Sequence, residues 1–238
     1  SNTISFGDAF AKSFNPVFVN IGMHSLDKDT LAAYGEAFGF NRSLQFELCM
    51  QPSLLVIDDE PYHWAEIASG FNRTTLMSPL HGAMIVAVSL NNGQWVEPRI
   101  IDKIRTGNDT IYRGRPSSGP RVIQPGTAAA LKKMMETTVR SGTAAKTFRG
   151  ASRDKILSQL TIGGKTGSIN DRPDYSIRYD LFTGFAEKKD GSRKIAVSVF
   201  VAHKDFIGTR AARYARLGIK KYYEIIAYEA ASKESKKT

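Results

Sequence analysis

The chain has 238 residues, of which 42% are hydrophobic and 24% are charged, as in an ordinary globular protein that can bury a large core. It contains no apolar run near the roughly 18 residues that a membrane-spanning helix needs and no N-terminal signal pattern, so we expect any membrane anchor to lie outside this chain. The 33 Lys and Arg outnumber the 23 Asp and Glu, but they are scattered, which favours a solvated basic surface over a specific nucleic-acid site.

The sequence at the start of the chain predicts two short helices joined by a short, fixed loop. Ser5 is a capping residue and predicts the start of a helix over residues 9–12. Pro16 disfavours helical geometry in the residue before it but suits the first turn of a helix, so Asn15 is predicted to cap a second helix. Residues 13–15 are therefore expected to form a loop between two helices.

Periodic and aperiodic stretches alternate through the middle of the chain. Apolar side chains at helical spacing and capping residues mark the helices, whereas clusters of Gly, Pro, Arg and Ser mark the loops. The predicted elements are helices over residues 27–38, 78–92 and 127–139, an extended segment over 95–104, and irregular stretches over 41–68 and 106–125.

After residue 155 the pattern changes to β-strands. Three strands are predicted in succession, over residues 156–170, 179–187 and 195–203. Asp190-Gly191 marks a hairpin turn between the second and third strands, and a final helix is predicted over 207–230. Helices followed by an antiparallel meander that a helix closes indicate an α+β fold, with a mostly helical part over about 5–150 and a sheet part over about 151–238.

The segment Gly-Gly-Lys-Thr-Gly-Ser at the end of the first predicted strand combines a cation with two hydroxyls. Lys165, Thr166 and Ser168 can present these groups to a substrate carboxylate, and Gly167 leaves room for an extended peptide to pair as an added strand. Taken alone, the segment is better explained as a glycine-rich strand end. A phosphate-binding loop is excluded, because its first glycine is missing and the segment does not lead into a helix.

Ser13 and Asn15 form a Ser-x-Asn pair in the predicted loop between the first two helices. In isolation, Asn15 is equally well explained as a helix cap. Ser-x-Asn in such a loop, followed much later by Lys-Thr-Gly-Ser on the first strand of a terminal meander, matches two of the three signatures of acyl-serine transferases in the right order. The combination therefore favours a catalytic interpretation of both segments.

With these motifs, the chain resembles the transpeptidase domain of penicillin-binding proteins. The similarity extends beyond the motifs to the helix that opens with Ser78-Pro79-Leu80 and to the strand Phe182-Thr183-Gly184-Phe185. Segments similar to the family pattern lie at residues 10–18, 34–40, 67–70, 77–83, 92–93, 97–100, 139–144, 182–185 and 195–201. The resemblance thus covers nearly all of the chain.

The resemblance implies a serine D,D-transpeptidase of peptidoglycan synthesis that is blocked by β-lactams and acts at the periplasmic or outer face of the bacterial inner membrane. In such enzymes a serine is acylated by the D-Ala-D-Ala end of a stem peptide, and an amine from a neighbouring strand then forms the crosslink. The resemblance implies no cofactor. A serine D,D-carboxypeptidase or a β-lactamase is the nearest enzymatic alternative.

The resemblance also implies roles for the motif residues. Ser13 would relay protons, and Asn15 would hydrogen-bond the substrate amide. Lys165 would supply positive charge near the Ser13 hydroxyl and the substrate carboxylate. The hydroxyls of the two residues that flank Gly167, Thr166 and Ser168, would bind that carboxylate, with the glycine lining the cleft.

The family's third motif, Ser-x-x-Lys, holds the nucleophile and should lie upstream of Ser13, but none of the twelve residues there fits it. The segments 25–28 and 152–155 have the pattern but follow the second motif, and we predict them to be surface turns. We therefore expect the parent protein to be an enzyme and this chain alone to be inactive. The rival hypothesis is a non-catalytic pseudoenzyme that binds peptides or acts as a scaffold in wall synthesis.

Two further expectations concern partners and metals. The family's sheet has five strands, two of them from before the nucleophile motif, so the strand at 195–203 is expected to have an unpaired edge that is either exposed or paired with a second copy. The four histidines are far apart in sequence and Cys49 is the single cysteine, so neither a metal site nor an internal disulfide is expected.

Overall fold

A computed structural model describes residues 3–115, 118–170 and 176–235, in which the chain forms two compact units. The sheet unit contains the described residues up to Ser13 and those from Lys132 onward, and the helical unit spans Phe14–Leu131. Helix α6 (Pro125–Arg140) runs from the helical unit into the sheet unit. A domain boundary at about residue 150 stays a prediction.

The helical unit contains four helices and two small antiparallel ribbons besides the start of α6. The helices are α2 (Asn15–His24), α3 (Lys28–Ala37), α4 (Pro61–Ser69) and α5 (Pro79–Leu90). The strands are β1 (Gln94–Val96), β2 (Lys103–Thr106), β3 (Asp109–Arg113) and β4 (Ser118–Arg121). Strand β1 pairs with β4, and β2 pairs with β3.

Close packing of helices and one tryptophan organises this unit. Trp95 is fully buried, and its indole N–H donates to a carboxylate oxygen of Glu97 at 2.9 Å. Helix α2 lies so close to α4 that a Cβ at Gly22 would overlap the backbone of Ala65. The central buried cluster contains Met84, Val88, Trp95, Ile123 and Ala128.

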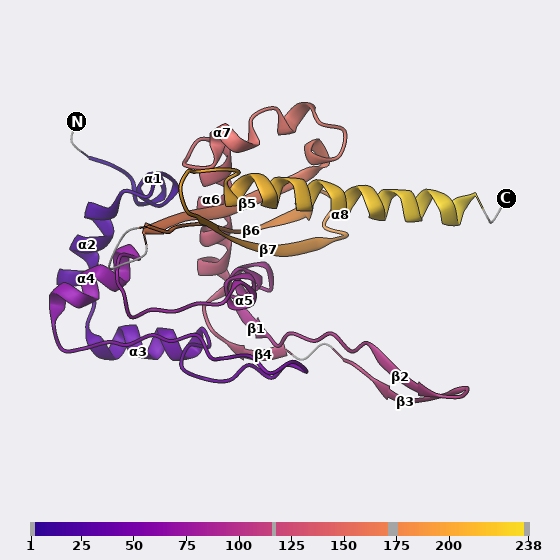
Figure 1. Ribbon diagram of the computed structural model, residues 1–238, viewed down its shortest axis with the longest axis horizontal. Helices are drawn as coiled ribbons and strands as arrows, with labels where there is room; N and C mark the ends of the chain where they lie inside the picture. The colour runs from indigo at the N-terminus through magenta and orange to yellow at the C-terminus, as the bar shows by residue number, and fades with distance from the viewer. Residues whose placement is uncertain (1–2, 116–117, 171–175, 236–238) are drawn as a thin grey trace. The chain divides into compact units, whose positions relative to one another are not determined.

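The sheet unit is built around three long antiparallel strands in the order β5-β6-β7, and α8 lies along the sheet and continues past its end (Figure 1). The strands are β5 (Leu160–Asn170), β6 (Arg178–Lys188) and β7 (Lys194–His203). The helices are α1 (Phe6–Lys12), α7 (Ala145–Phe148) and α8 (Ala211–Glu234), with single 3-10 turns at Ala151–Arg153 and Leu157–Gln159. The α+β fold predicted from the sequence is confirmed.

The register of the sheet decides which side chains face α8. Thr166 on β5 lies opposite Phe182 on β6, which lies opposite Val199 on β7, and this row faces the helix. Phe182 is fully buried there with Ala211 and Ala215 of α8. Because successive residues of a strand point to opposite faces, Lys165 lies on the other face of the sheet.

The edges of this sheet agree with one expectation. Within the described residues, β7 pairs with β6 alone and β5 pairs with β6 alone, so both outer strands have an unpaired edge. The described part of the chain also contains no helix long and apolar enough to cross a bilayer.

The structure corrects several details of the predicted elements. The stretch 41–68 contains α4, which begins at Pro61 directly after an acidic run that looks like a turn. The stretch 106–125 contains β3 and β4, and β3 shows no apolar alternation because all its residues are exposed. Helix α6 begins at Pro125, before the predicted cap, and α8 begins at Ala211.

The predicted cap of the second helix is also wrong. Asn15 is the first residue of α2, Phe14 occupies the capping position, and no side chain caps this helix. The side chain of Pro16 fixes the first turn, as expected, so this helix starts without a side-chain acceptor.

Candidate active site

Lys165 on β5 and Ser13 at the end of α1 lie in direct contact within the sheet unit. The Lys165 Nζ donates to Ser13 Oγ at 2.5 Å and to the backbone carbonyl oxygen of Thr166 at 3.0 Å. The centroid of the Phe10 ring lies 5.8 Å from the same nitrogen. The fold thus brings together one residue from each of the two predicted motifs.

Helix α1 is held in place so that Ser13 reaches the sheet. Ala9 and Ala11 are buried, and the Thr143 N–H donates to the carbonyl oxygen of Ala11 at 3.0 Å. A Cβ at Gly142 would overlap that same carbonyl oxygen, so the absence of a side chain there permits the contact. The sequence around residues 142–143 therefore positions the helix that carries Ser13.

Ser13 ends α1 in a left-handed conformation, with φ 53° and ψ 48°. For a residue other than glycine this conformation costs about 1–2 kcal/mol. Its backbone N–H closes the helix by bonding the carbonyl oxygens of Ala9 and Phe10, and the turn directs its hydroxyl to Lys165. Strain of this kind persists where the surrounding structure fixes it and is common at functional sites.

Burial rather than a neighbouring charge controls the protonation of Lys165. Among the described residues, no ion pair involves this lysine. Desolvation lowers the pKa of Lys165 below its ordinary value, because the charged form loses hydration when it is buried. A lysine with a lowered pKa has a larger fraction of neutral amine than an exposed lysine at the same pH, and a neutral amine can act as a base.

The hydroxyl of Thr166 pairs with a residue that the sequence analysis did not single out. Thr166 Oγ1 and Thr143 Oγ1 lie 2.6 Å apart, and either of them can donate. A pair of hydroxyls needs only one proton between its oxygens, so the second proton remains available for an external acceptor. The signal that could have indicated Thr143 was its place in a segment, residues 139–144, that resembles the family pattern.

The hydroxyl of Ser168 is bound to a buried carboxylate. Ser168 Oγ donates to Asp180 Oδ1 at 3.1 Å, and Asp180 is only 5% exposed. The same carboxylate accepts the Ala211 backbone N–H at 2.8 Å and lies 3.3 Å from the Arg210 guanidinium. Asp180 therefore links the motif strand to the start of α8, where a negative charge is favourable to the helix dipole.

Gly167 differs from the other motif glycines in what surrounds it. A Cβ at Gly163 or Gly164 would overlap the ring of Phe185 or Phe182, so packing excludes side chains there. At Gly167 a Cβ would meet only the Leu181 side chain, at an ordinary 3.6 Å. Packing within the described chain therefore does not require this glycine, which agrees with a need for open space beside the unpaired edge of β5.

The remaining predicted site residue, Asn15, belongs to the helical unit. It is exposed at the first position of α2, and its side chain caps no helix. Its predicted role toward a substrate amide is untested.

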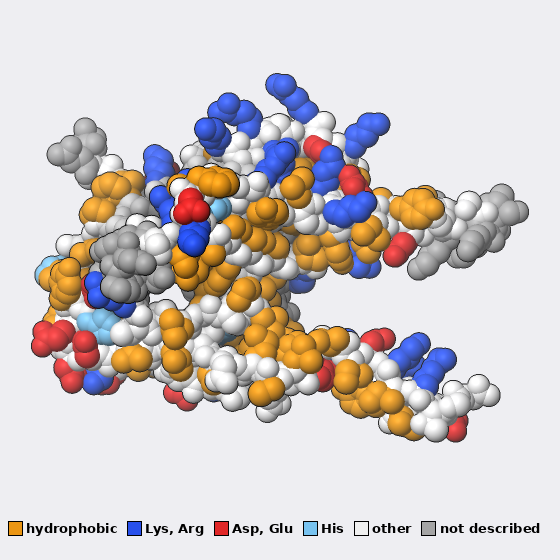
Figure 2. All heavy atoms as spheres, viewed as in Figure 1, with side chains coloured by type: hydrophobic (Ala, Val, Ile, Leu, Met, Phe, Trp, Pro, Cys, Tyr) orange, Lys and Arg blue, Asp and Glu red, His pale blue; other side chains and the backbone are white. Residues whose placement is uncertain are grey.

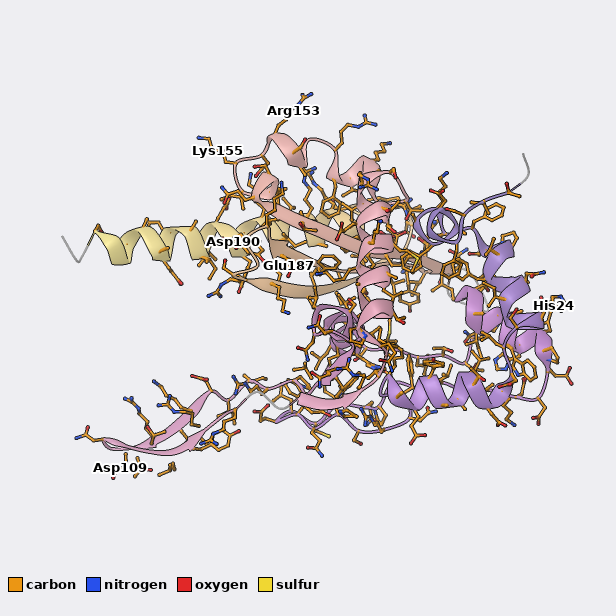
Figure 3. All side chains as sticks on the ribbon, turned by 180° about the vertical axis from the view of Figure 1, so that it is seen from behind. His24, Asp109, Arg153, Lys155, Glu187 and Asp190 are labelled. Carbon is orange, nitrogen blue, oxygen red and sulfur yellow. The ribbon has the colours of Figure 1, made fainter. Side chains whose placement is uncertain are left out.

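Both segments that mimic a nucleophile motif are surface turns, as predicted. Ser25 ends α2, and Lys28 pairs with Asp59 at 2.8 Å. Ser152 is exposed in a 3-10 turn, and the neighbouring Arg153 and Lys155 project from the surface (Figure 3).

Within the described ranges, no group of three or more His, Cys, Asp or Glu side chains is placed to hold a metal ion.

Comparisons with known proteins show the family of this chain. The family model described as "Penicillin binding protein transpeptidase domain" matches residues 1–220. The peptidoglycan D,D-transpeptidase PbpA of Mycolicibacterium smegmatis is 26% identical over 210 residues, which are 84% of this chain and 39% of that protein. Penicillin-binding protein 1A of Neisseria cinerea is 31% identical over 224 residues, which are 87% of this chain and 25% of that protein.

Solved structures share the fold. Penicillin-binding protein A from M. tuberculosis, in its imipenem acyl-enzyme complex, superposes with a TM-score of 0.73 at 23% identity, covering 92% of this chain and 47% of that one. This chain therefore spans less than half the length of each of these three relatives.

Proposed function

Because the chain belongs to the penicillin-binding protein transpeptidase domain family, we propose that it forms part of a peptidoglycan D,D-transpeptidase that crosslinks stem peptides through a serine acyl-enzyme. The observation that carries the proposal is the contact between Lys165 Nζ and Ser13 Oγ, because it joins the two motifs at one point. The substrate is the D-Ala-D-Ala end of a stem peptide, and β-lactams occupy the same site.

Ser13 and Lys165 act together as a proton relay in this proposal. Lys165 donates to the Ser13 oxygen, so the hydroxyl proton of Ser13 points away from the lysine and is available to the departing amine. Burial lowers the pKa of Lys165, so a larger fraction of its amine is neutral and can accept a proton. Asn15 holds the amide of the substrate backbone.

The substrate lies as an added strand along the unpaired edge of β5. Main-chain hydrogen bonds to β5 then orient the peptide, and Gly167 lets its backbone approach. The carboxylate of the terminal D-Ala accepts the spare proton of the Thr143–Thr166 pair and lies near the charge of Lys165. The hydroxyl of Ser168 becomes a second donor to the substrate carboxylate when its proton turns away from Asp180.

Binding of the substrate mimic tests this proposal on the chain itself. An N-acyl-D-Ala-D-Ala dipeptide, titrated to about 10 mM into isotopically labelled chain, should shift the backbone amide signals of residues 165–170. Thr166→Val should weaken the binding, and the L-Ala-L-Ala dipeptide should not shift these signals. Equal shifts with both dipeptides, or none with either, would exclude the proposed site.

We propose that this chain by itself does not form the acyl-enzyme, since no Ser-x-x-Lys segment occupies the place that the family pattern requires. Intact-mass measurement after incubation with penicillin should therefore show no adduct. An adduct would contradict this proposal and show that the chain holds a nucleophile of its own. The reaction takes place on the extracytoplasmic side of the bacterial membrane, where peptidoglycan lies.

A non-catalytic scaffold or peptide-binding role is the second candidate, and the open edge of β7 favours it. We propose that β7 pairs with the β7 of a second copy, which would extend the sheet across two molecules. The complete gene separates the two functions: a Ser-x-x-Lys ahead of Ser13 supports the enzyme, and its absence supports the scaffold.

A further inference from the structure

The ribbon of β2 and β3 in the helical unit is exposed along its whole length. Every residue of both strands, Lys103–Thr106 and Asp109–Arg113, is exposed to solvent. Figure 1 shows the ribbon extending away from β1 and β4, and Figure 2 shows hydrophobic and basic side chains gathered along it. A two-stranded hairpin without a buried face is only marginally stable in water.

At the base of the ribbon the register places exposed side chains on two chemically different faces, and it shifts between Ile104 and Arg105, which leaves Ile111 without an opposite residue. Ile104 lies opposite Tyr112, and they are 42% and 44% exposed. Lys103 lies opposite Arg113 and occupies the other face of the ribbon. Directly opposed like charges destabilise a strand pair, so this arrangement does not serve the stability of the hairpin.

The charges around the ribbon are predominantly positive, and the charge of Arg99 contributes, after backbone hydrogen bonds, to lowering the pKa of the Glu47 carboxyl at the base. Over residues 99–115, five Lys and Arg stand against two Asp. None of the ion pairs found in the described residues involves any of the five. The basic residues are Arg99, Lys103, Arg105, Arg113 and Arg115, and the exposed apolar residues are Ile100, Ile101, Ile104, Ile111 and Tyr112.

The base of the ribbon is anchored, so the side chains are presented on a defined element. The carboxylate of Glu47 accepts the backbone N–H groups of Ile100 and Ile101 at 3.0 and 3.2 Å. Across the ribbon, the Gly114 N–H donates to the carbonyl oxygen of Asp102 at 2.8 Å. These bonds fix the backbone on both sides of the hairpin while leaving its faces open.

From this arrangement we infer that the β2–β3 ribbon binds the surface of an anionic phospholipid bilayer. Its apolar face, centred on Ile104 and Tyr112, enters the boundary between headgroups and acyl chains, where tyrosine is favoured. The ribbon is only two strands wide, so the long side chains of Lys103 and Arg113 reach around its edges to the phosphates. This surface is independent of the peptide site proposed for β5.

The combination of the two faces distinguishes a bilayer from other anionic partners. A soluble polyanion would be bound by the charges alone and would gain nothing from exposed Ile104, Ile111 and Tyr112. A bilayer uses both kinds of side chain, because apolar burial and attraction to anionic headgroups add together. The apolar and basic residues must therefore both contribute to binding.

Sedimentation with lipid vesicles tests this inference on the chain as it is. The chain should bind vesicles of phosphatidylglycerol and phosphatidylcholine but not vesicles of phosphatidylcholine alone. The Ile104→Ser/Tyr112→Ser variant should bind about tenfold more weakly. The Arg105→Gln/Arg113→Gln variant should bind about thirtyfold more weakly, since each cation near the surface contributes roughly a fivefold effect.

The matched control removes two charges elsewhere. Arg153 and Lys155 are exposed on the sheet unit (Figure 3), and Arg153→Gln/Lys155→Gln should change binding by less than about threefold. An equal loss in this control would show attraction by net charge and overturn the inference. Unchanged binding of the Ile104→Ser/Tyr112→Ser variant, or no binding by the unmodified chain, would overturn it as well. Circular dichroism of each variant, expected to match the parent, confirms folding.

Discussion

At the scale of single residues, the site depends on two polar groups that burial controls in different ways. Lys165 is buried without a carboxylate, so its pKa falls, whereas the carboxylate of Asp180 is buried with three donors around it. The lysine is suited to exchange a proton, and the aspartate is suited to hold structure in place. Each assignment predicts a measurable effect.

The lowered pKa of Lys165 predicts how stability changes with pH. Between the lowered pKa and the ordinary value of 10.5, the unfolded chain binds more protons at this group than the folded chain does. The stability contributed by the group therefore rises with pH across that window. In urea unfolding, the stability of the parent relative to Lys165→Met should increase from pH 7 to pH 10.

The exposed lysine at residue 155 provides the control for this measurement. Lys155→Met removes an exposed positive charge, so it shows how far the loss of a surface charge alone changes the free energy of unfolding at pH 7 and at pH 10. If the free energies of unfolding of the parent and of Lys165→Met depended on pH in the same way, burial would not lower the pKa of Lys165.

The hydrogen bonds of Asp180 predict a loss of stability when its carboxylate is removed. Asp180→Ala leaves the Ala211 N–H and the Ser168 hydroxyl without their acceptor, and it should lower the free energy of unfolding by about 1–3 kcal/mol. The exposed Asp109 at the hairpin tip is the control, and Asp109→Ala should change the value by less than about 0.5 kcal/mol. Chemical denaturation measures the free energy of unfolding of both variants. Equally small losses in Asp180→Ala and Asp109→Ala would contradict the structural role of Asp180.

At the scale of elements, local signals predicted the fold well where capping and periodicity agreed. The helix cap Ser5, the Asp27 cap of α3 and the Ser78 cap of α5 all accept the backbone N–H groups that such caps satisfy. Helix α4 and strand β3 were missed, because an acidic run hides the start of the former and the latter lacks a buried face.

The candidate site shows the same division between local and long-range information. Ser13 and Lys165 were recognised from motif spacing, and the fold places them in contact. Thr143 and Asp180 were not recognised, because their roles depend on cross-strand and tertiary hydrogen bonds that no local pattern encodes. Asn15 was given a capping role that Phe14 occupies, since Pro16 alone suffices to begin the helix.

Substitutions at Gly142 and Gly167 should distinguish a glycine needed for packing from a glycine needed for ligand binding. Gly142→Ala should lower the free energy of unfolding by about 1–3 kcal/mol, because a Cβ there overlaps the Ala11 carbonyl oxygen. Gly167→Ala should leave stability within about 0.5 kcal/mol of the parent but weaken binding of the D-Ala-D-Ala dipeptide. Thermal melts and the dipeptide titration measure the two effects. Unchanged dipeptide binding by Gly167→Ala would contradict the proposed substrate path along β5.

The unpaired edge of β7 predicts self-association. Sedimentation velocity should show a dimer whose fraction rises with protein concentration, because edge strands present unmatched N–H and carbonyl groups. Ser198→Pro, near the middle of the strand, removes one edge donor and should favour the monomer. A chain that stays monomeric at all concentrations would contradict the pairing of two copies.

At the scale of the whole molecule, the family and the proposed activity rest on different observations. The family follows from a match over residues 1–220 and from a shared fold. The proposed activity rests on the contact between Ser13 and Lys165 beside the outer strand β5, and on the hydroxyl pair of Thr143 and Thr166 in the same sheet unit. This chain spans 39% of the length of the Mycolicibacterium smegmatis relative and 25% of that of the Neisseria cinerea relative.

The rate at which penicillin acylates the protein encoded by the complete gene tests the central claim most directly. Stopped-time labelling with a fluorescent penicillin should give a rate constant at least about a hundredfold lower for Lys165→Met and for Ser13→Ala than for the parent, because the proton relay is lost. Lys155→Met, in the surface turn, should react like the parent. Equal acylation rates in all four proteins would contradict a catalytic role for the contact between Ser13 and Lys165.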